Sequence, residues 1–297
     1  MSRKGWALFI ALCVIWGIPY LLIRVAVEEL SPPALVFFRT AVAAVVLLPL
    51  ALRRGQMRGL WPHWRWILAY TMVELAVPWL LLSHAEQRLS SSMAGLIVAS
   101  VPLIAVIVYR AFGVLDHVDA RRLIGLLVGF AGVAALVGLD FGARDGLAMA
   151  EVGLVALCYA VGPLIISRRL ADLPSLGVVA ASLVITSVLY APWALATLPE
   201  SVSAQTVGAV ATLSLVCTAL AFVLFFALIY EVGPARSTVI TYINPLVAVL
   251  LGVWLLAEPF TLGIAVGLPL ILLGSVLGTA PAMRRAPEEE PAAAAAP

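Results

Sequence analysis

Residues 102–106 read Pro-Leu-Ile-Ala-Val, and residues 245–249 read Pro-Leu-Val-Ala-Val, at an offset of 143 positions. The match continues outward on both sides. The first apolar stretch, with Ala11-Leu12-Cys13, has a counterpart at Ala156-Leu157-Cys158, and the fifth, with Gly125-Leu126, has one at Gly267-Leu268. We therefore predict an internal duplication. Each copy holds five apolar stretches, an odd number, so the two copies are expected to cross a membrane in opposite orientations.

The composition places the chain in a membrane. It is 63% hydrophobic and 11% charged, with a mean hydropathy of +1.10, whereas soluble domains are about 45–50% apolar and about 25% charged. A helix needs about 20 apolar residues to cross the hydrocarbon core. The sequence predicts an all-α membrane protein with ten transmembrane helices, at 6–25, 33–52, 65–84, 91–111, 121–140, 147–167, 175–195, 207–230, 236–256 and 261–280.

These spans divide the chain into three parts. We predict a first five-helix repeat at 1–142, a second, inverted five-helix repeat at 143–285, and a disordered tail at 286–297, where three glutamates are followed by alanine and proline. Lys and Arg residues concentrate in the loops on one side, which the positive-inside rule assigns to the cytoplasm. We therefore expect a multi-pass protein of the inner or plasma membrane with both termini cytoplasmic.

Several function classes are disfavoured. The net charge of +2 reflects the loop bias, so we expect no nucleic-acid partner. The sequence has no phosphate-binding glycine loop with its lysine, and its three histidines are predicted near span ends, so neither an ATP-driven pump nor an enzyme is indicated. Cys13, Cys158 and Cys217 fall inside predicted spans without metal-ligand spacing. We expect no metal and no cofactor.

Three motifs, taken in order, are similar to those of a known family. They are Trp16-Gly17 followed by Ser31-Pro32-Pro33 and Arg39; Gly233-Pro234-Ala235 through Tyr242, Pro245 and Gly252 to Glu258-Pro259; and Gly267 through Leu272-Leu273-Gly274. Together they resemble EamA-type members of the drug/metabolite transporter superfamily. The resemblance implies two inverted five-helix repeats and a secondary transporter, most often an exporter of amino acids or other small metabolites. One departure is that Leu115-Asp116 stands in the first half where Glu258 stands in the second.

Glu74 is the sharpest candidate for chemistry. It lies about nine residues into the third predicted span, so at about 1.5 Å per residue it is roughly 13 Å deep. A charge at that depth costs at least about 2.5–3.5 kcal/mol. Glu74 can therefore carry a proton or meet a substrate ammonium group. The alternative is a structural carboxylate paired with Arg39 or hydrogen-bonded between helices.

Two other charged residues are given structural roles. Arg39, on the second span, can bind a substrate carboxylate, but we favour a role in holding helices together. Glu258 is the acidic marker that the family resemblance places at the end of the ninth span.

Two equivalent prolines predict breaks near the middle of the fourth and ninth spans, because proline removes a backbone hydrogen bond. Pro102 and Pro245 are therefore candidate hinges. Ser100 precedes the first break, and Tyr242 and Asn244 precede the second. We treat these three as candidate substrate-binding residues, because they can supply donors and acceptors beside the freed carbonyls.

Aromatic residues away from span ends complete the candidate site. They are Trp16, Trp79, Tyr159 and Phe222, of which Trp79 and Phe222 are partners in the repeat. An aromatic cavity suits an amphipathic amino acid or a cation over a ring face. The alternative is that these rings fill helix contacts or face lipid.

The sequence therefore predicts a secondary transporter that exports small amphipathic metabolites, amino acids first, by alternating access coupled to proton exchange through Glu74. The resemblance places the substrate between spans 1, 3, 4, 6, 8 and 9. The expected partners are a small-molecule substrate and the lipid bilayer, with the chain a monomer or homodimer. The main alternative is a multidrug exporter of lipophilic cations. A membrane enzyme, a lipid scramblase and a structural subunit rank lower.

Overall fold

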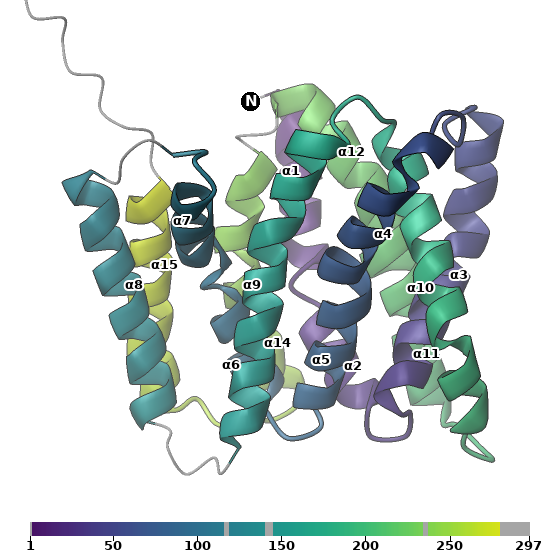
Figure 1. The fold of residues 1–297 in the computed structure, drawn as a ribbon. Helices are drawn as coiled ribbons and strands as arrows, with labels where there is room; N and C mark the ends of the chain where they lie inside the picture. The colour runs from purple at the N-terminus through teal and green to yellow at the C-terminus, as the bar shows by residue number, and fades with distance from the viewer. Residues whose placement is uncertain (1, 116–118, 140–144, 234–236, 280–297) are drawn as a thin grey trace, which may run out of the picture.

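A computed structural model describes residues 2–115, 119–139, 145–233 and 237–279, and all regular structure in these ranges is helical (Figure 1). Asp116 and the predicted tail at 286–297 lie outside the described residues. The first half contains α1 (Arg3–Ile15), α2 (Pro19–Ala26), α3 (Pro32–Arg53), η1 (Trp61–His63), α4 (Trp64–Thr71), η2 (Met72–Ala76), α5 (Val77–Ala85), α6 (Ser91–Val98), α7 (Val101–Ala111) and α8 (Ala120–Leu139). The second half contains α9 (Gly146–Arg169), α10 (Ser175–Ala196), α11 (Ala204–Ser214), η3 (Leu215–Leu220), α12 (Ala221–Val232), η4 (Thr238–Tyr242), α14 (Asn244–Leu255) and α15 (Leu262–Thr279).

The prediction of an all-α fold with ten membrane helices is confirmed. Among the described residues, nine continuous helical stretches are long and apolar enough to cross a membrane, and Val239–Leu255 is a shorter apolar helix. That shorter helix lies within the predicted ninth span, 236–256. Its first turns form the tight 3-10 helix η4 before α14 begins. Before it, Gly233, with a φ of +82°, ends α12.

Serine side chains start several helices. Ser31, Ser90 and Ser203 each accept a hydrogen bond from a backbone N–H in the first turn of the helix that follows, α3, α6 and α11 respectively. Such caps satisfy donors that have no partner within the helix. They allow the chain to reverse direction in a few residues, so that loops take up little of the described chain.

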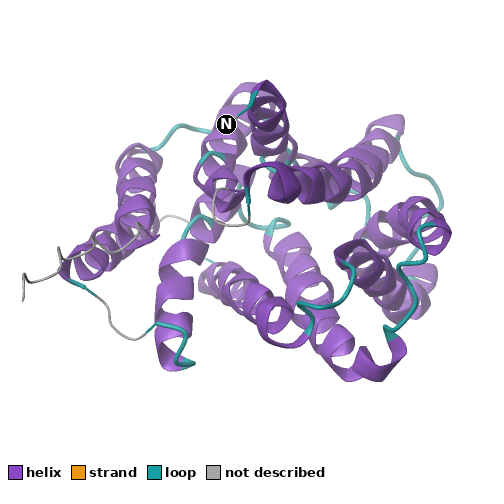
Figure 2. Ribbon diagram, turned by 90° about the horizontal axis from the view of Figure 1, so that it is seen from above, coloured by secondary structure: helices purple, strands orange, loops and turns teal. Residues whose placement is uncertain are grey.

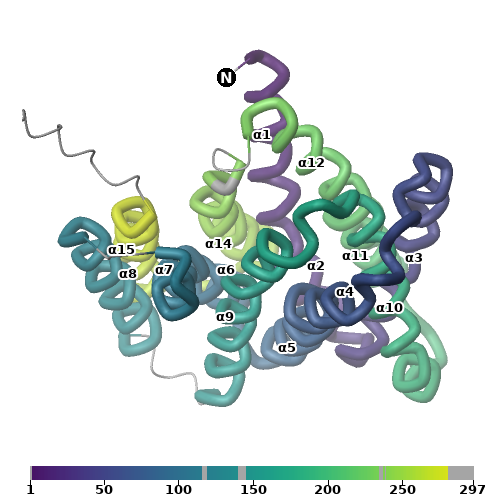
Figure 3. The backbone as a smooth tube through the Cα atoms, turned by 45° about the horizontal axis from the view of Figure 1, so that its top comes forward, coloured from purple at the N-terminus to yellow at the C-terminus, as the bar shows by residue number. Residues whose placement is uncertain are grey.

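The closest helix pairs join the two halves of the chain. α3 packs on α10, α8 on α15, α5 on α9, α6 on α14, and α2 on α11. Figure 2 shows the helices end-on, and Figure 3 shows α8 and α15 at one edge with α3 and α10 at the other. Neither half therefore buries its apolar surface alone.

Glycines bring α8 and α15 into backbone contact. A Cβ at Gly125 would lie 2.8 Å from the Gly274 carbonyl oxygen, and one at Gly132 would lie 3.0 Å from the Gly267 carbonyl oxygen. Side chains at these places would force the helices apart. Small residues at a helix interface permit this close approach in membrane proteins.

Candidate substrate and proton site

Two spans contain a wider helical turn at matching places. The third span includes the π-helical segment η2 (Met72–Ala76), and the eighth includes η3 (Leu215–Leu220). These segments start 143 residues apart, the same offset that relates the proline motifs. π-helical turns are rare and are often found at functional sites. No feature of the sequence predicted them.

Glu74 lies in the first of these segments and faces α9. Its Oε2 is buried and has no hydrogen-bond partner. The side chain fits because position 162 on α9 is glycine: a Cβ there would overlap the Glu74 carboxyl group. The proposed alternative, a pair between Glu74 and Arg39, is not among the ion pairs of the described residues.

The groups within electrostatic reach of Glu74 carry hydroxyls and a thiol. They are Tyr70, Tyr109, Cys158 and Tyr159. An ionised carboxylate buried without a cation costs several kcal/mol. The arrangement suits a carboxyl group that holds a proton or receives a cationic ligand.

Arg39 is buried and joins the halves. Its guanidinium lies 3.7 Å from the ring centre of Trp79 on α5, and its Nε donates to Thr218 Oγ1 at 3.1 Å. Thr218 belongs to η3, the second π-helical segment, and its hydroxyl also donates to the Leu213 carbonyl. Arg39 thus connects α3 with the third and eighth spans, a structural arrangement of the kind that we favoured. Sequence reasoning did not identify Thr218.

The aromatic candidates form a connected wall. Trp16 lies at the break between α1 and α2 and packs edge-on against Phe222, with 6.2 Å between the ring centres. Its ring centre is 4.8 Å from that of Phe225. Phe222 stacks on Phe226 at 6.2 Å. Phe222, Phe226 and Tyr159 pack against the same apolar cluster that contains Trp79. The aromatic surface therefore extends from the Arg39 region to Phe226.

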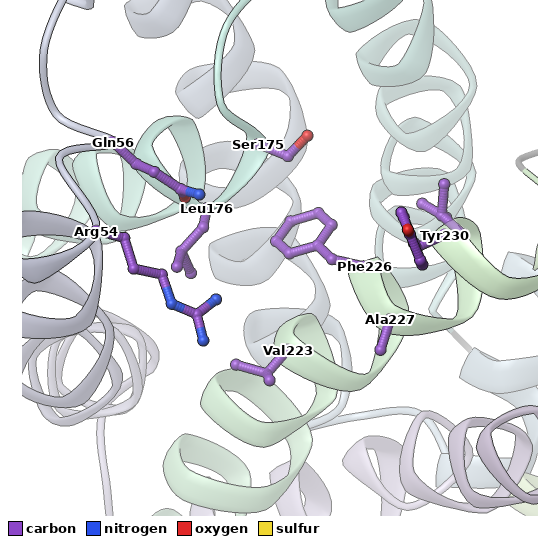
Figure 4. A pocket seen from close by; sticks show the side chains of 9 residues that line it. Arg54, Gln56, Ser175, Leu176, Val223, Phe226, Ala227 and Tyr230 are labelled. Carbon is purple, nitrogen blue, oxygen red and sulfur yellow. The ribbon is translucent and has the colours of Figure 1, made fainter. Parts of the chain in front are cut away.

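Phe226 borders a cavity of about 560 Å³ (Figure 4). Its wall combines residues from α10, α12 and the loop after α3: Arg54, Gln56, Ser175, Leu176, Val223, Phe226, Ala227, Ile229 and Tyr230. These belong to the end of the bundle at which α3 ends and α10 begins, the same end as the N-terminus (Figure 1). The aromatic wall thus connects the interior to an opening at the N-terminal end.

Three polar residues that we predicted to bind substrate have hydrogen-bond partners within the protein. Ser100 Oγ donates to the Ile97 carbonyl at 2.6 Å, and the Tyr242 hydroxyl contacts Thr279 Oγ1. The Asn244 amide, oriented to donate, reaches the Cys13 and Ile240 carbonyls at 3.1 and 2.9 Å. The structure therefore gives their side chains local partners, outside the aromatic wall.

Both candidate hinge prolines stand where a helix restarts. The fourth span is interrupted at Ala99 and Ser100, and Pro102 lies in the first turn of α7. In the ninth, Pro245 lies in the first turn of α14 after the end of η4. First-turn prolines remove no hydrogen bond within their own helix. The predicted breaks are therefore present in both spans.

Glu258 caps a helix of the other half. Its carboxylate accepts from the backbone N–H of Ser91 at 2.7 Å, from that of Ser92 at 3.0 Å, and from the Ser92 hydroxyl. A carboxylate at a helix N-terminus is stabilised by these donors and by the helix dipole. Glu258 thereby attaches the α14–α15 loop to α6.

Comparisons with known proteins agree with these observations. The sequence matches the EamA-like transporter family over residues 3–138 and again over 148–279. It is 32% identical over 267 residues to the uncharacterized inner membrane transporter YedA of Escherichia coli K12, covering 85% of this chain and 82% of that protein. It is 25% identical to the uncharacterized transporter YvbV of Bacillus subtilis, covering 92% and 90%. A crystal structure with 22% identity, covering 94% of this chain and 97% of that one, has the same fold with a TM-score of 0.67.

Proposed function

The chain belongs to the EamA-like transporter family, and on that premise we propose that it is a secondary transporter that exports small amphipathic metabolites, amino acids first, in exchange for protons. The single observation that carries the proposal is the Glu74 carboxyl. It is buried without a hydrogen-bond partner for Oε2, in a π-helical segment, facing a glycine of the opposite half.

The two halves supply the moving parts of this mechanism. We propose that residues 1–142 and 143–285 are inverted repeats that rock against each other. The helix restarts at Pro102 and Pro245 are then the hinges. The cavity at the N-terminal end corresponds to a conformation open on that side. With that end in the cytoplasm, as the positive-inside rule favours, substrate enters from the cell interior.

The site offers both kinds of contact that an amphipathic substrate needs. Rings of Trp16 and Phe222 provide an apolar surface, and the carboxyl of Glu74 provides one acceptor for an ammonium group. A proton and an ammonium group compete for the same carboxylate. Loading substrate from one side and a proton from the other therefore couples the two fluxes.

The second candidate is an exporter of lipophilic cations. The observation in its favour is the same carboxyl beside aromatic rings, which attract cations through their faces. A lipophilic cation has no carboxylate, so its binding site needs no group that binds one. The two candidates thus differ in whether a zwitterion is transported.

Counterflow in proteoliposomes distinguishes them. Vesicles are preloaded with unlabelled amino acids, and uptake of each labelled amino acid is followed. A parallel set is loaded with a lipophilic cation. Selective uptake of one chemical group of amino acids supports the first candidate. Uptake of only the cation supports the second, and no uptake above that of empty vesicles in either set contradicts the proposal.

A further inference from the structure

A second buried acid lies at the end of the bundle opposite the N-terminus. Glu86 follows α5 directly, in the turn that leads to α6. Its relative exposure is 0%, and neither carboxyl oxygen has a hydrogen-bond partner. Sequence reasoning passed over it because it falls in a predicted loop, where a glutamate is ordinarily solvated.

Charged and titratable groups face Glu86 from each neighbouring element. They are Tyr20 and Arg24 on α2, Arg39 on α3, and Glu258 in the α14–α15 loop. Arg24 does not pair with the carboxyl group; its Nη1 donates to the Glu86 backbone carbonyl at 2.7 Å. The two basic residues close to Glu86 in sequence pair with other acids. His84 pairs with Glu151, and Arg88 pairs with Asp145 and Glu151.

Glu86 and Glu258 are therefore two nearby acids with unequal surroundings. Glu258 accepts three hydrogen bonds at the start of α6, which stabilises its charged form. Glu86 accepts none. Burial, followed by the negative charge of Glu258, raises the pKa of Glu86 well above its usual range, and Arg24 and Arg39 offset this only in part.

The helices around the pair are in close contact. A Cβ at Gly95 on α6 would lie 2.8 Å from Cβ of Ala248 on α14 and 3.6 Å from the ring of Tyr20 on α2. A Cβ at Gly252 would overlap the Glu258 carboxylate and the Ser92 hydroxyl. We call this contact between α2, α6 and α14 the seal. It lies towards the end of the bundle opposite the 560 Å³ cavity.

A second cavity lies at the edge of the seal. It has a volume of about 210 Å³ and is lined by Leu89 and Ser90 on the Glu86 turn and by Pro259 and Thr261 on the Glu258 loop. Arg88, two residues after Glu86, and Pro259, one residue after Glu258, both line it. The cavity is therefore bordered by the two chain segments that carry the acids.

From this geometry we propose that Glu86 is a proton-binding site of the seal, occupied while the seal is closed and vacated when it opens. The inference rests on the proposed function only in assuming that the seal opens at all. Closed, the carboxyl group has no donor and must keep its proton. When α6 and α14 separate, water solvates the carboxylate beside Arg24 and Arg39, and the proton leaves to that side.

The dependence on pH has a definite sign. The closed seal binds one proton more than the open seal, so protons on that side stabilise the closed state. This stabilisation is complete below the ordinary glutamate pKa of about 4.3. It is lost as pH rises through the raised pKa of the closed state. Raising the pH on that side therefore opens the seal.

Thiol labelling tests this directly. In a variant without Cys13, Cys158 and Cys217, Ala94→Cys puts a thiol on α6 beside Gly95, at a position that is fully buried in the closed seal. A second variant carries Ser201→Cys, in an exposed loop at the same end. Both variants are labelled with a membrane-impermeant maleimide, and the labelling rate of the first is divided by that of the second. The division cancels the maleimide's own dependence on pH.

We expect this ratio to rise several-fold in chains with Glu86 as the pH is raised through the raised pKa of the closed state. In Glu86→Gln, which keeps the shape and cannot ionise, the ratio should stay low and flat. The matched control Glu28→Gln, an exposed acid at the same end, should keep the rise. A flat ratio with Glu86 present, or an unchanged rise in Glu86→Gln, would overturn the proposal.

Counterflow in the same vesicles separates this proposal from the proposed function. A rising ratio without counterflow supports the proton site and contradicts transport of the substrates tested. Counterflow with a flat ratio supports transport and rejects Glu86. The pH dependence of the ratio is measured in chains that keep Glu86. Poor folding of Glu86→Gln therefore does not affect that part of the test.

Discussion

The two π-helical segments have the same backbone distortion and different chemistry. In the first half, η2 presents Glu74, whose Oε2 has no partner. In the second, η3 has Cys217 at the matching position and uses Thr218 to hold Arg39 of the first half. Just before η2, Thr71 Oγ1 donates to Ser182 Oγ at 2.8 Å, and position 182 lies 143 residues after Arg39. One segment thus presents a buried acid, and the other binds a buried cation of the opposite half.

The largest effect is expected from crowding the acid. Gly162→Ala puts a Cβ where the Glu74 carboxyl group lies, so that group must move. Displacement of a reacting group by about 1 Å can cost about 100-fold in rate. We expect proton-driven accumulation to fall by about 10- to 100-fold, measured in proteoliposomes with an imposed pH gradient. Gly153→Ala, on the same helix with open space around it, should leave accumulation unchanged; equal losses would show that the effect does not come from Glu74.

The next effect concerns the fixed cation. Thr218→Val removes the acceptor of the Arg39 Nε–H and leaves it buried without that partner, which costs about 1–3 kcal/mol. Unfolding titrations in mixed detergent micelles measure this loss. The control is Thr212→Val, whose hydroxyl bonds only to its own helix, at the Gly208 carbonyl. A Thr218→Val loss no larger than that of the control would mean that Arg39 is not held by this bond.

A smaller effect is expected at the neutral contact between Thr71 and Ser182. Thr71→Val removes the hydrogen bond to Ser182, and a neutral bond of this kind contributes about 0.5–1.5 kcal/mol. The same unfolding titration checks the value. A loss larger than that of Thr218→Val would reverse the contrast drawn between a charged and a neutral contact.

The smallest effect is expected at the partner of Glu74. Cys217 is buried without a charge, so Cys217→Ala removes one sulfur atom from an apolar contact and should cost less than about 1.5 kcal/mol. Transport rates should remain at the wild-type level. Loss of proton coupling in this variant would show that both segments, and not η2 alone, carry protons.

The sequence predicts the fold well because each span depends on a run of apolar residues, which is local information. The span predicted at 91–111 agrees with α6 and α7 together, Ser91–Ala111. Glu74 could be found for the same reason, since a lone acid in such a run is conspicuous. Its neighbour Gly162 is 88 positions away in sequence and has no side chain to mark it.

Contacts between the halves could not be predicted. Thr218 cannot be told from other threonines until η3 places it beside Arg39. Glu86 cannot be told from other loop acids until the fold buries it completely beside Arg24. Asn244 was expected near the substrate because it precedes a proline, but its amide bonds to Cys13 and Ile240 carbonyls. In each case the side chain's role depends on an element far away in sequence.

The account depends most on Glu74 as the proton carrier, and Glu74→Gln tests it most directly. The variant keeps the shape of the side chain and cannot bind or release a proton. In proteoliposomes we expect Glu74→Gln to retain counterflow exchange, because the amide oxygen still accepts a hydrogen bond from an ammonium group, and to lose accumulation driven by a pH gradient. Unchanged gradient-driven accumulation in Glu74→Gln would contradict the central claim and remove Glu74 from the proton path.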